Sequence, residues 1–182
     1  MAEAGPAEVP VAAIRDMLRW FKATRVSGAV IGGVAVSIRA HARFTRDLDA
    51  LVVVQDAKWP EFAGRAEKFG FTGRVPDVLE FASQTRMLLL QHESSGVPLD
   101  VSLGALGFEE ELIGRATIVK LGRLKVPIAA AEDLIILKAV AQRPIDLADI
   151  DSLLQAQPRL DLVRIRKTLG QFAGILERPE IN

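Results

Sequence analysis

The order in which helical and strand-like patterns follow one another constrains the fold of this chain more than any other feature. Apolar residues at helical spacing predict helices at 11–21, 34–42, 59–69, 130–141, 146–155 and 161–176. Short β-rich runs predict strands at 29–31, 48–54, 87–91, 97–103, 118–121 and 124–126. This order predicts an α/β (α+β) fold with a mixed sheet flanked by helices, and with a helical last third.

The same patterns divide the chain into three segments. Residues 1–9 are small and polar and are expected to form a flexible N-terminus. Residues 10–128 carry all the predicted strands and are expected to form an α/β core. Residues 129–182 carry only helical patterns and are expected to pack on that core as a C-terminal helical segment.

Composition excludes several classes of protein. The 23 basic and 23 acidic side chains give no net charge, which argues against non-specific binding to nucleic acid. The absence of cysteine excludes disulfides, thiolate zinc sites and a cysteine nucleophile, and two histidines are too few for a three-histidine zinc site. No apolar run reaches the about 20 residues that cross a bilayer, and residues 1–10 do not resemble a secretory signal. We therefore expect a cytoplasmic protein without a membrane partner.

Two aspartates at the start of a predicted strand are the first candidates for chemistry. Asp47 and Asp49 are two residues apart, so both lie on one face while Leu48 points into the core. Neighbouring carboxylates repel each other, and a cation between them relieves that repulsion. Oxygen ligands of this kind suit Mg²⁺ or Mn²⁺. The alternative is that Asp47 caps a turn and Asp49 is a solvated strand residue.

Gly32 and Gly33 separate a short apolar strand from a helical pattern. Glycines there allow a ligand to approach the backbone closely, and free N–H groups at a helix start bind anions such as a triphosphate. The alternative is a tight turn that needs a positive φ.

Asp100 is the third acidic candidate. It alternates with the apolar residues Leu99 and Val101, so it faces away from the core side of its strand. If that strand lies beside 48–54, the Asp100 carboxylate joins Asp47 and Asp49. The alternative is an exposed strand aspartate.

The order of these pieces resembles a known superfamily. Gly32-Gly33, thirteen further residues, Asp47-Leu48-Asp49 and a later strand aspartate are similar to the pattern of DNA polymerase β-like nucleotidyltransferases. More narrowly, the chain resembles the AbiEii-type and related minimal bacterial nucleotidyltransferases, some of which are toxins. Residues 132–150 also resemble a helical motif of those proteins, so the resemblance spans about 26–155. Many active members have Gly-Ser where this chain has Gly32-Gly33.

The resemblance implies transfer of a nucleoside monophosphate from a nucleoside triphosphate to an acceptor, with release of pyrophosphate. Asp47, Asp49 and Asp100 are then the catalytic carboxylates and the ligands of Mg²⁺ or Mn²⁺. Asp100 is also the expected acceptor of the proton from the attacking hydroxyl. Gly32 and Gly33 are expected to cradle the phosphates.

Three basic residues are the remaining nucleotide-binding candidates, and the resemblance implies the role of the first, Lys138. Lys138 is expected to place its charge near the triphosphate, with a solvent-facing lysine as the alternative. Arg43 either neutralises the acidic site or touches substrate. Arg143 either pairs with Asp146 or approaches a phosphate. Asp146 and Asp149 are expected to serve as a helix cap and in surface ion pairs.

The resemblance leaves the acceptor and the partners open. The acceptor is an RNA or tRNA end, a protein hydroxyl or a small molecule, and a cognate antitoxin is a further expected partner. The alternative function is a catalytically inactive nucleotide-binding or regulatory domain that acts through a partner.

Overall fold

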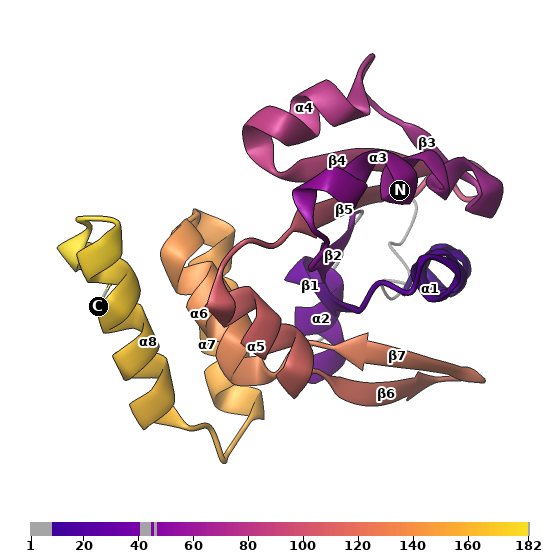
Figure 1. The fold of residues 1–182 in the computed structure, drawn as a ribbon. Helices are drawn as coiled ribbons and strands as arrows, with labels where there is room; N and C mark the ends of the chain where they lie inside the picture. Colours follow the sequence, from indigo (N-terminus) through magenta and orange to yellow (C-terminus); the bar gives the residue numbers. More distant parts are fainter. Residues whose placement is uncertain (1–8, 41–44, 46, 182) are drawn as a thin grey trace, which may run out of the picture.

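The computed structural model describes residues 9–40, 45 and 47–181. They form a seven-stranded mixed sheet with helices packed around it, so the predicted α/β fold is confirmed (Figure 1). The strands are β1 (Gly28–Ile31), β2 (Leu48–Val52), β3 (Phe71–Gly73), β4 (Met87–His92), β5 (Pro98–Leu103), β6 (Thr117–Leu121) and β7 (Leu124–Ile128). The α-helices are α1 (Val11–Thr24), α2 (Gly32–Arg39), α3 (Trp59–Gly64), α4 (Val78–Thr85), α5 (Gly107–Arg115), α6 (Ala131–Ala141), α7 (Pro144–Ala156) and α8 (Leu162–Ile175).

The strand order β3-β4-β5-β2-β1-β7-β6 places β2 in the middle of the sheet. Strand β2 runs antiparallel to β1 and parallel to β5. Strands β4 and β5 form the first predicted hairpin, and β6 and β7 form the second, which projects from the sheet (Figure 1). One end of the sheet is the β6–β7 hairpin, and at the other end β3 adds antiparallel to β4, whereas β2 with β5 and β1 with β7 are parallel pairs.

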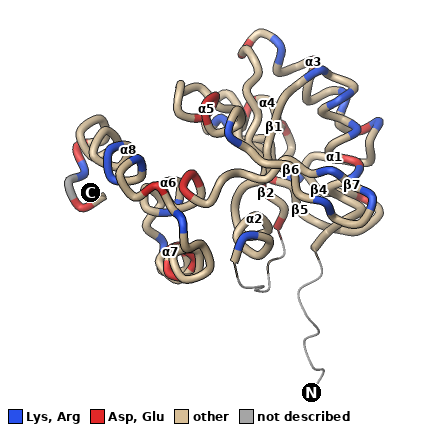
Figure 2. Tube along the Cα trace, turned by 90° about the horizontal axis from the view of Figure 1, so that it is seen from below, with Lys and Arg blue, Asp and Glu red and all other residues tan. Residues whose placement is uncertain are grey.

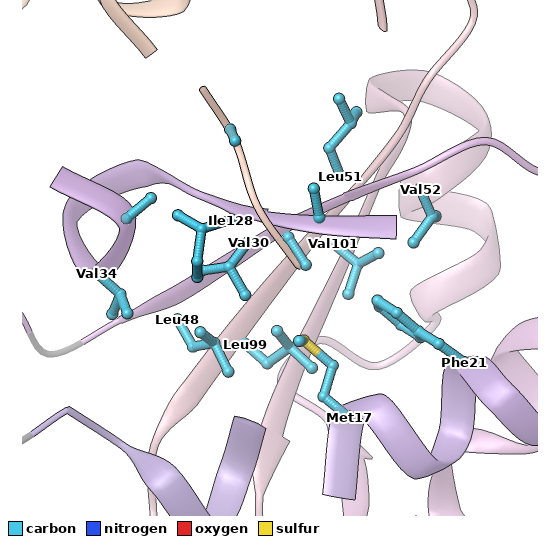
Figure 3. Close-up of a cluster of buried hydrophobic side chains, with 14 of the residues drawn as sticks. Met17, Phe21, Val30, Val34, Leu48, Leu51, Val52, Leu99, Val101 and Ile128 are labelled. Atoms are coloured by element: carbon cyan, nitrogen blue, oxygen red, sulfur yellow. The ribbon is translucent and has the colours of Figure 1, made fainter. Parts of the chain in front are cut away.

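One face of the central strands packs against α1. The apolar residues of β5 alternate with polar ones, and Leu99 and Val101 are fully buried on the core side. Figure 3 shows Met17 and Phe21 of α1 beside this apolar face. Because side chains alternate along a strand, the polar residues of β5 lie on the opposite face of the sheet. That opposite face carries the candidate site.

The last three helices lie together beside the sheet (Figure 1). Helices α6 and α7 contact α2, which follows the Gly32-Gly33 pair. Asp133 on α6 is fully buried and forms ion pairs with Arg115 of α5 and Arg164 of α8. These buried pairs fix α6 relative to its neighbours. The division at residue 128 stays a prediction.

Some local predictions were wrong. The helix expected over 59–69 is divided, because residues 66–69 adopt a 3-10 turn, and the helices α4 and α5 were not anticipated. His92 is only 1% exposed, because it shares the core face of β4 with Leu88 and Leu90. Within the described residues, no helix is both long and apolar enough to cross a membrane.

Candidate functional site

The acidic centre lies where β2 and β5 run side by side. The parallel register pairs Asp49 directly with Asp100, so the condition on which the prediction for Asp100 depended is met. Adjacent strands are about 4.8 Å apart, so the two carboxylates share one face at close range. Asp47 lies immediately before β2 and lines the same pocket. All three predicted carboxylates therefore meet at one site.

Position 32 requires a glycine, because the backbone there packs directly against the Asp49 side chain. The φ of Gly32 is +64°, in the left-handed region that favours glycine, and a Cβ there would lie 2.0 Å from Oδ2 of Asp49. The backbone N–H of Gly33 donates a hydrogen bond to the Asp49 carboxylate. The start of α2 therefore holds Asp49 in place, a use of the glycine pair that the sequence did not predict.

The surroundings of Asp49 and Asp100 make these two carboxyl groups hard to ionise. Burial, followed by the charges of Asp100 and Asp47, raises the pKa of Asp49 to about 6, while the Gly33 N–H and Lys138 act in the opposite direction. Burial also raises the pKa of Asp100, and Arg74 opposes that rise. Carboxylates with raised pKa values gain from a nearby cation, and such groups mark candidate functional sites.

A pocket of about 360 Å³ opens over the acidic centre. The sheet side of the pocket carries the three carboxylates and the two glycines. The helical side is formed by α6 and α7 and by residues between them. The lining residues on that side are Leu134, Leu137, Lys138, Ala141, Arg143, Ile145 and Asp146. The pocket therefore has an acidic wall facing a wall that carries two basic side chains.

Lys138 is buried beside two aspartates. Its Nζ lies 2.9 Å from Oδ1 of Asp146 and 2.6 Å from Oδ2 of Asp149, and its side chain is 6% exposed. The expectation that Asp146 and Asp149 form surface ion pairs is wrong, because their side chains are 0% and 2% exposed. Asp146 does cap α7, since its carboxylate accepts the backbone N–H of Arg143. The ammonium of Lys138 thus lines the pocket and is held by two carboxylates.

Arg143 pairs with the same aspartate. Its Nε lies 2.7 Å from Oδ2 of Asp146, and its side chain is 69% exposed. Pairing with Asp146, one of the two expected roles, is therefore observed, and the guanidinium also lines the pocket. Arg43 lies outside the described residues.

Arg74 is a pocket neighbour that the sequence analysis missed. It follows β3 and forms an ion pair with the Asp100 carboxylate. Its position in a short polar connection carries no periodic signal, and it is far from Asp100 in sequence. Only the order of the strands brings the two residues together.

The donor set fits a hard divalent cation, because three carboxylates converge and repel one another. In the described part of the chain, however, no three acidic or imidazole groups are arranged closely enough to hold a metal ion as they stand. The ion pair with Arg74 engages the third carboxylate. Arg74 therefore competes for Asp100 with any metal ion that the three carboxylates would hold.

The sequence of the chain matches one described protein family. Residues 11–175 match the family described as "Nucleotidyl transferase of unknown function (DUF2204)". No curated protein matches the sequence. The nucleotidyltransferase part of the expected resemblance is thereby confirmed, while the AbiEii-type subgroup stays a prediction.

Solved structures show the same fold. The antibiotic-resistance factor ANT(2'')-Ia is 17% identical, with 93% of this chain and 94% of that chain covered and a TM-score of 0.63. An antigenic nucleotidyltransferase-like protein from Paracoccidioides brasiliensis is 16% identical, with 97% and 93% covered and a TM-score of 0.57. The lincosamide antibiotic adenylyltransferase LnuA is 16% identical, with 82% and 98% covered and a TM-score of 0.54.

Proposed function

The chain belongs to the DUF2204 family of nucleotidyl transferases, and we propose that it transfers a nucleoside monophosphate from a nucleoside triphosphate to an acceptor hydroxyl with the help of Mg²⁺ or Mn²⁺. The observation that supports this proposal best is the register that pairs Asp49 with Asp100, with Gly32 packed against Asp49. Only glycine fits at that position, so the acidic centre and the start of α2 form one unit.

Asp47, Asp49 and Asp100 are the residues that would hold the divalent ions. A bound ion supplies positive charge to the triphosphate oxygens and lowers the pKa of the acceptor hydroxyl. Asp49 is fixed for this role by the Gly33 N–H and by the close packing of Gly32. The carboxylates repel each other without a cation, so they favour binding of one.

Asp100 is the residue proposed to take the proton of the acceptor. The acceptor oxygen attacks the α-phosphorus, the bond from that phosphorus to the bridging oxygen breaks, and pyrophosphate leaves. The hydroxyl proton passes to the Asp100 carboxylate.

The helical wall supplies positive charge to the triphosphate. Lys138 faces the acidic centre across the pocket, and its two aspartate partners hold the ammonium in one place. Arg143 is more exposed and stands at the same wall. Charge fixed before the substrate arrives stabilises the leaving pyrophosphate without reorganisation.

The acceptor is proposed to be a hydroxyl of a small molecule, a protein or an RNA end. Two of the structural neighbours are named for work on antibiotics, one structure holding lincomycin and another adenylyl-2"-tobramycin. Lincomycin and tobramycin are therefore reasonable first acceptors to test. A cognate antitoxin stays a prediction from the resemblance.

Incubation of the protein with each α-³²P-labelled nucleoside triphosphate, Mg²⁺ and a cell extract tests the proposal. The panel is repeated with lincomycin and tobramycin in place of the extract. We expect label in one acceptor class with the wild-type chain and none with Asp49→Asn. Binding of nucleotide and Mg²⁺ without transfer to any acceptor would instead identify a nucleotide-binding domain that acts through a partner.

A further inference from the structure

Arg74 reaches the acidic centre from the edge of the sheet. Its backbone N–H donates to the carbonyl oxygen of Leu89 on β4 at 2.9 Å, and Leu89 is the register partner of Asp100 on β5. The Arg74 side chain therefore crosses β4 above Leu89 to pair with the Asp100 carboxylate. It approaches the carboxylates from the sheet side, whereas Lys138 and Arg143 approach from the helical side.

The contacts of Arg74 differ from those of the other two cations. Lys138 is buried between two aspartates. Arg143 is itself 69% exposed, but its partner Asp146 is fully buried and caps α7, so that carboxylate is not free to turn to a ligand. The Arg74 and Asp100 side chains are 31% and 25% exposed, so solvent and ligands have access to the pair. A partly exposed ion pair shifts an equilibrium by only about fivefold, which a ligand can overcome. Of these three cations, Arg74 is the one best suited to change partners.

We propose that Arg74 binds the triphosphate, and that it rests on Asp100 until nucleotide and metal arrive. This inference rests on the proposed function, since it assigns a phosphate-binding residue to the same site. A guanidinium presents paired N–H donors that match a carboxylate and a phosphate equally well. When Asp100 turns to a divalent ion, Arg74 loses its partner, and a phosphate oxygen of the incoming triphosphate replaces it.

This exchange makes Arg74 act in opposite directions in two binding equilibria. Without nucleotide, the guanidinium competes with the metal ion for Asp100, so Arg74 weakens metal binding. With a triphosphate present, the guanidinium gains a phosphate partner, so Arg74 strengthens binding of the metal-bound triphosphate. A purely structural residue would weaken both equilibria when replaced, or neither.

The test measures both equilibria in Arg74→Gln. Binding of Mn²⁺ alone is followed by electron paramagnetic resonance, and binding of magnesium tripolyphosphate, which carries the triphosphate without a base, is followed by calorimetry. We expect Arg74→Gln to bind Mn²⁺ about fivefold more tightly and magnesium tripolyphosphate about tenfold more weakly than the wild type. Arg74→Lys keeps the charge and should stay within about twofold of the wild type for Mn²⁺.

Arg65→Gln is the matched control, because Arg65 is also partly exposed and pairs with Glu61 away from the pocket. It should change neither equilibrium. Unchanged or weaker Mn²⁺ binding by Arg74→Gln would overturn the inference, as would unchanged binding of magnesium tripolyphosphate. A wild-type chain that binds no Mn²⁺ in an Asp49-dependent manner would overturn the proposed function together with the inference. Mn²⁺ binding that depends on Asp49 but has the same affinity in Arg74→Gln would overturn the inference and leave the proposed function in place.

Discussion

Replacement of Asp49 by asparagine should stabilise the metal-free protein at neutral pH while it abolishes metal binding. In the folded chain, burial and the neighbouring carboxylates raise the pKa of Asp49 from 3.8 to about 6. The unfolded chain has no such surroundings, so its carboxyl ionises at the ordinary value. The folded state therefore holds a proton between about pH 4 and pH 6 that the unfolded state has lost, and stability falls as the pH rises through that window.

The size of the effect follows from the same pKa. A rise from 3.8 to about 6 corresponds to about 3 kcal/mol of unfavourable free energy once Asp49 is ionised. Asparagine keeps the shape and never ionises, but its amide oxygen accepts the Gly33 N–H less strongly than a carboxylate, at a loss of about 1 kcal/mol. We therefore expect Asp49→Asn to gain about 1–3 kcal/mol at pH 7.5, which corresponds to roughly 3–10 °C in Tm.

The assay is thermal unfolding of both proteins at pH 4.5 and pH 7.5 in the presence of a chelator. The gain should be large at pH 7.5 and small at pH 4.5, where Asp49 is protonated in the folded chain. Mg²⁺ should raise the Tm of the wild type at pH 7.5 and leave that of Asp49→Asn unchanged. Asp56→Asn is the control, because Asp56 is exposed and pairs with Arg86, so it should gain nothing at either pH.

A loss of stability in Asp49→Asn at pH 7.5, in place of the expected gain, would contradict this prediction. It would mean that the Asp49 carboxylate is favourably placed in the metal-free fold. The acidic centre would then not be strained by its own charge, and the argument for a cation there would lose its electrostatic basis.

Two further substitutions test the glycine contact and the buried lysine. Gly32→Ala should lower the free energy of unfolding by at least about 2 kcal/mol and abolish Mn²⁺ binding, because its Cβ would overlap the Asp49 carboxylate. In the control Gly114→Ala the new Cβ meets no neighbour, so denaturant unfolding should show no such loss. Lys138→Met should destabilise the chain by about 3–5 kcal/mol at pH 7, since it leaves Asp146 and Asp149 without their buried cation. Urea titration measures this loss, and a value below about 1 kcal/mol would argue against the buried pairing.

The acidic centre could be predicted because its signals are local. The alternation of Leu99, Asp100 and Val101 assigns Asp100 to the polar face of its strand, and the spacing of Asp47 and Asp49 does the same for theirs. The sequence alone does not show that the two strands are neighbours. The parallel register of β2 and β5 shows that they are. Because parallel strands are not joined by a tight turn, no turn signal in the sequence could have indicated this pairing.

The cations could not be placed in the same way. Arg74 belongs to the site only because β4 lies between β3 and β5, and no local pattern encodes a strand order. The residues around Lys138 suggested a helix with surface pairs, but the packing of α7 on α6 buries Asp146 and Asp149 against it. Basic and acidic segments occur both on the α6–α8 side and on the sheet side, so overall charge did not mark the site either (Figure 2).

The position of the transferred phosphorus distinguishes nucleotidyl transfer from other reactions of a nucleoside triphosphate. The protein, Mg²⁺ and the identified acceptor are incubated with the same nucleoside triphosphate labelled with ³²P at the α-phosphate or at the γ-phosphate. We expect that the α label appears in the acceptor, that the γ label leaves with pyrophosphate, and that Asp49→Asn abolishes both. Transfer of the γ label to the acceptor, or unchanged α transfer by Asp49→Asn, would contradict the proposed function.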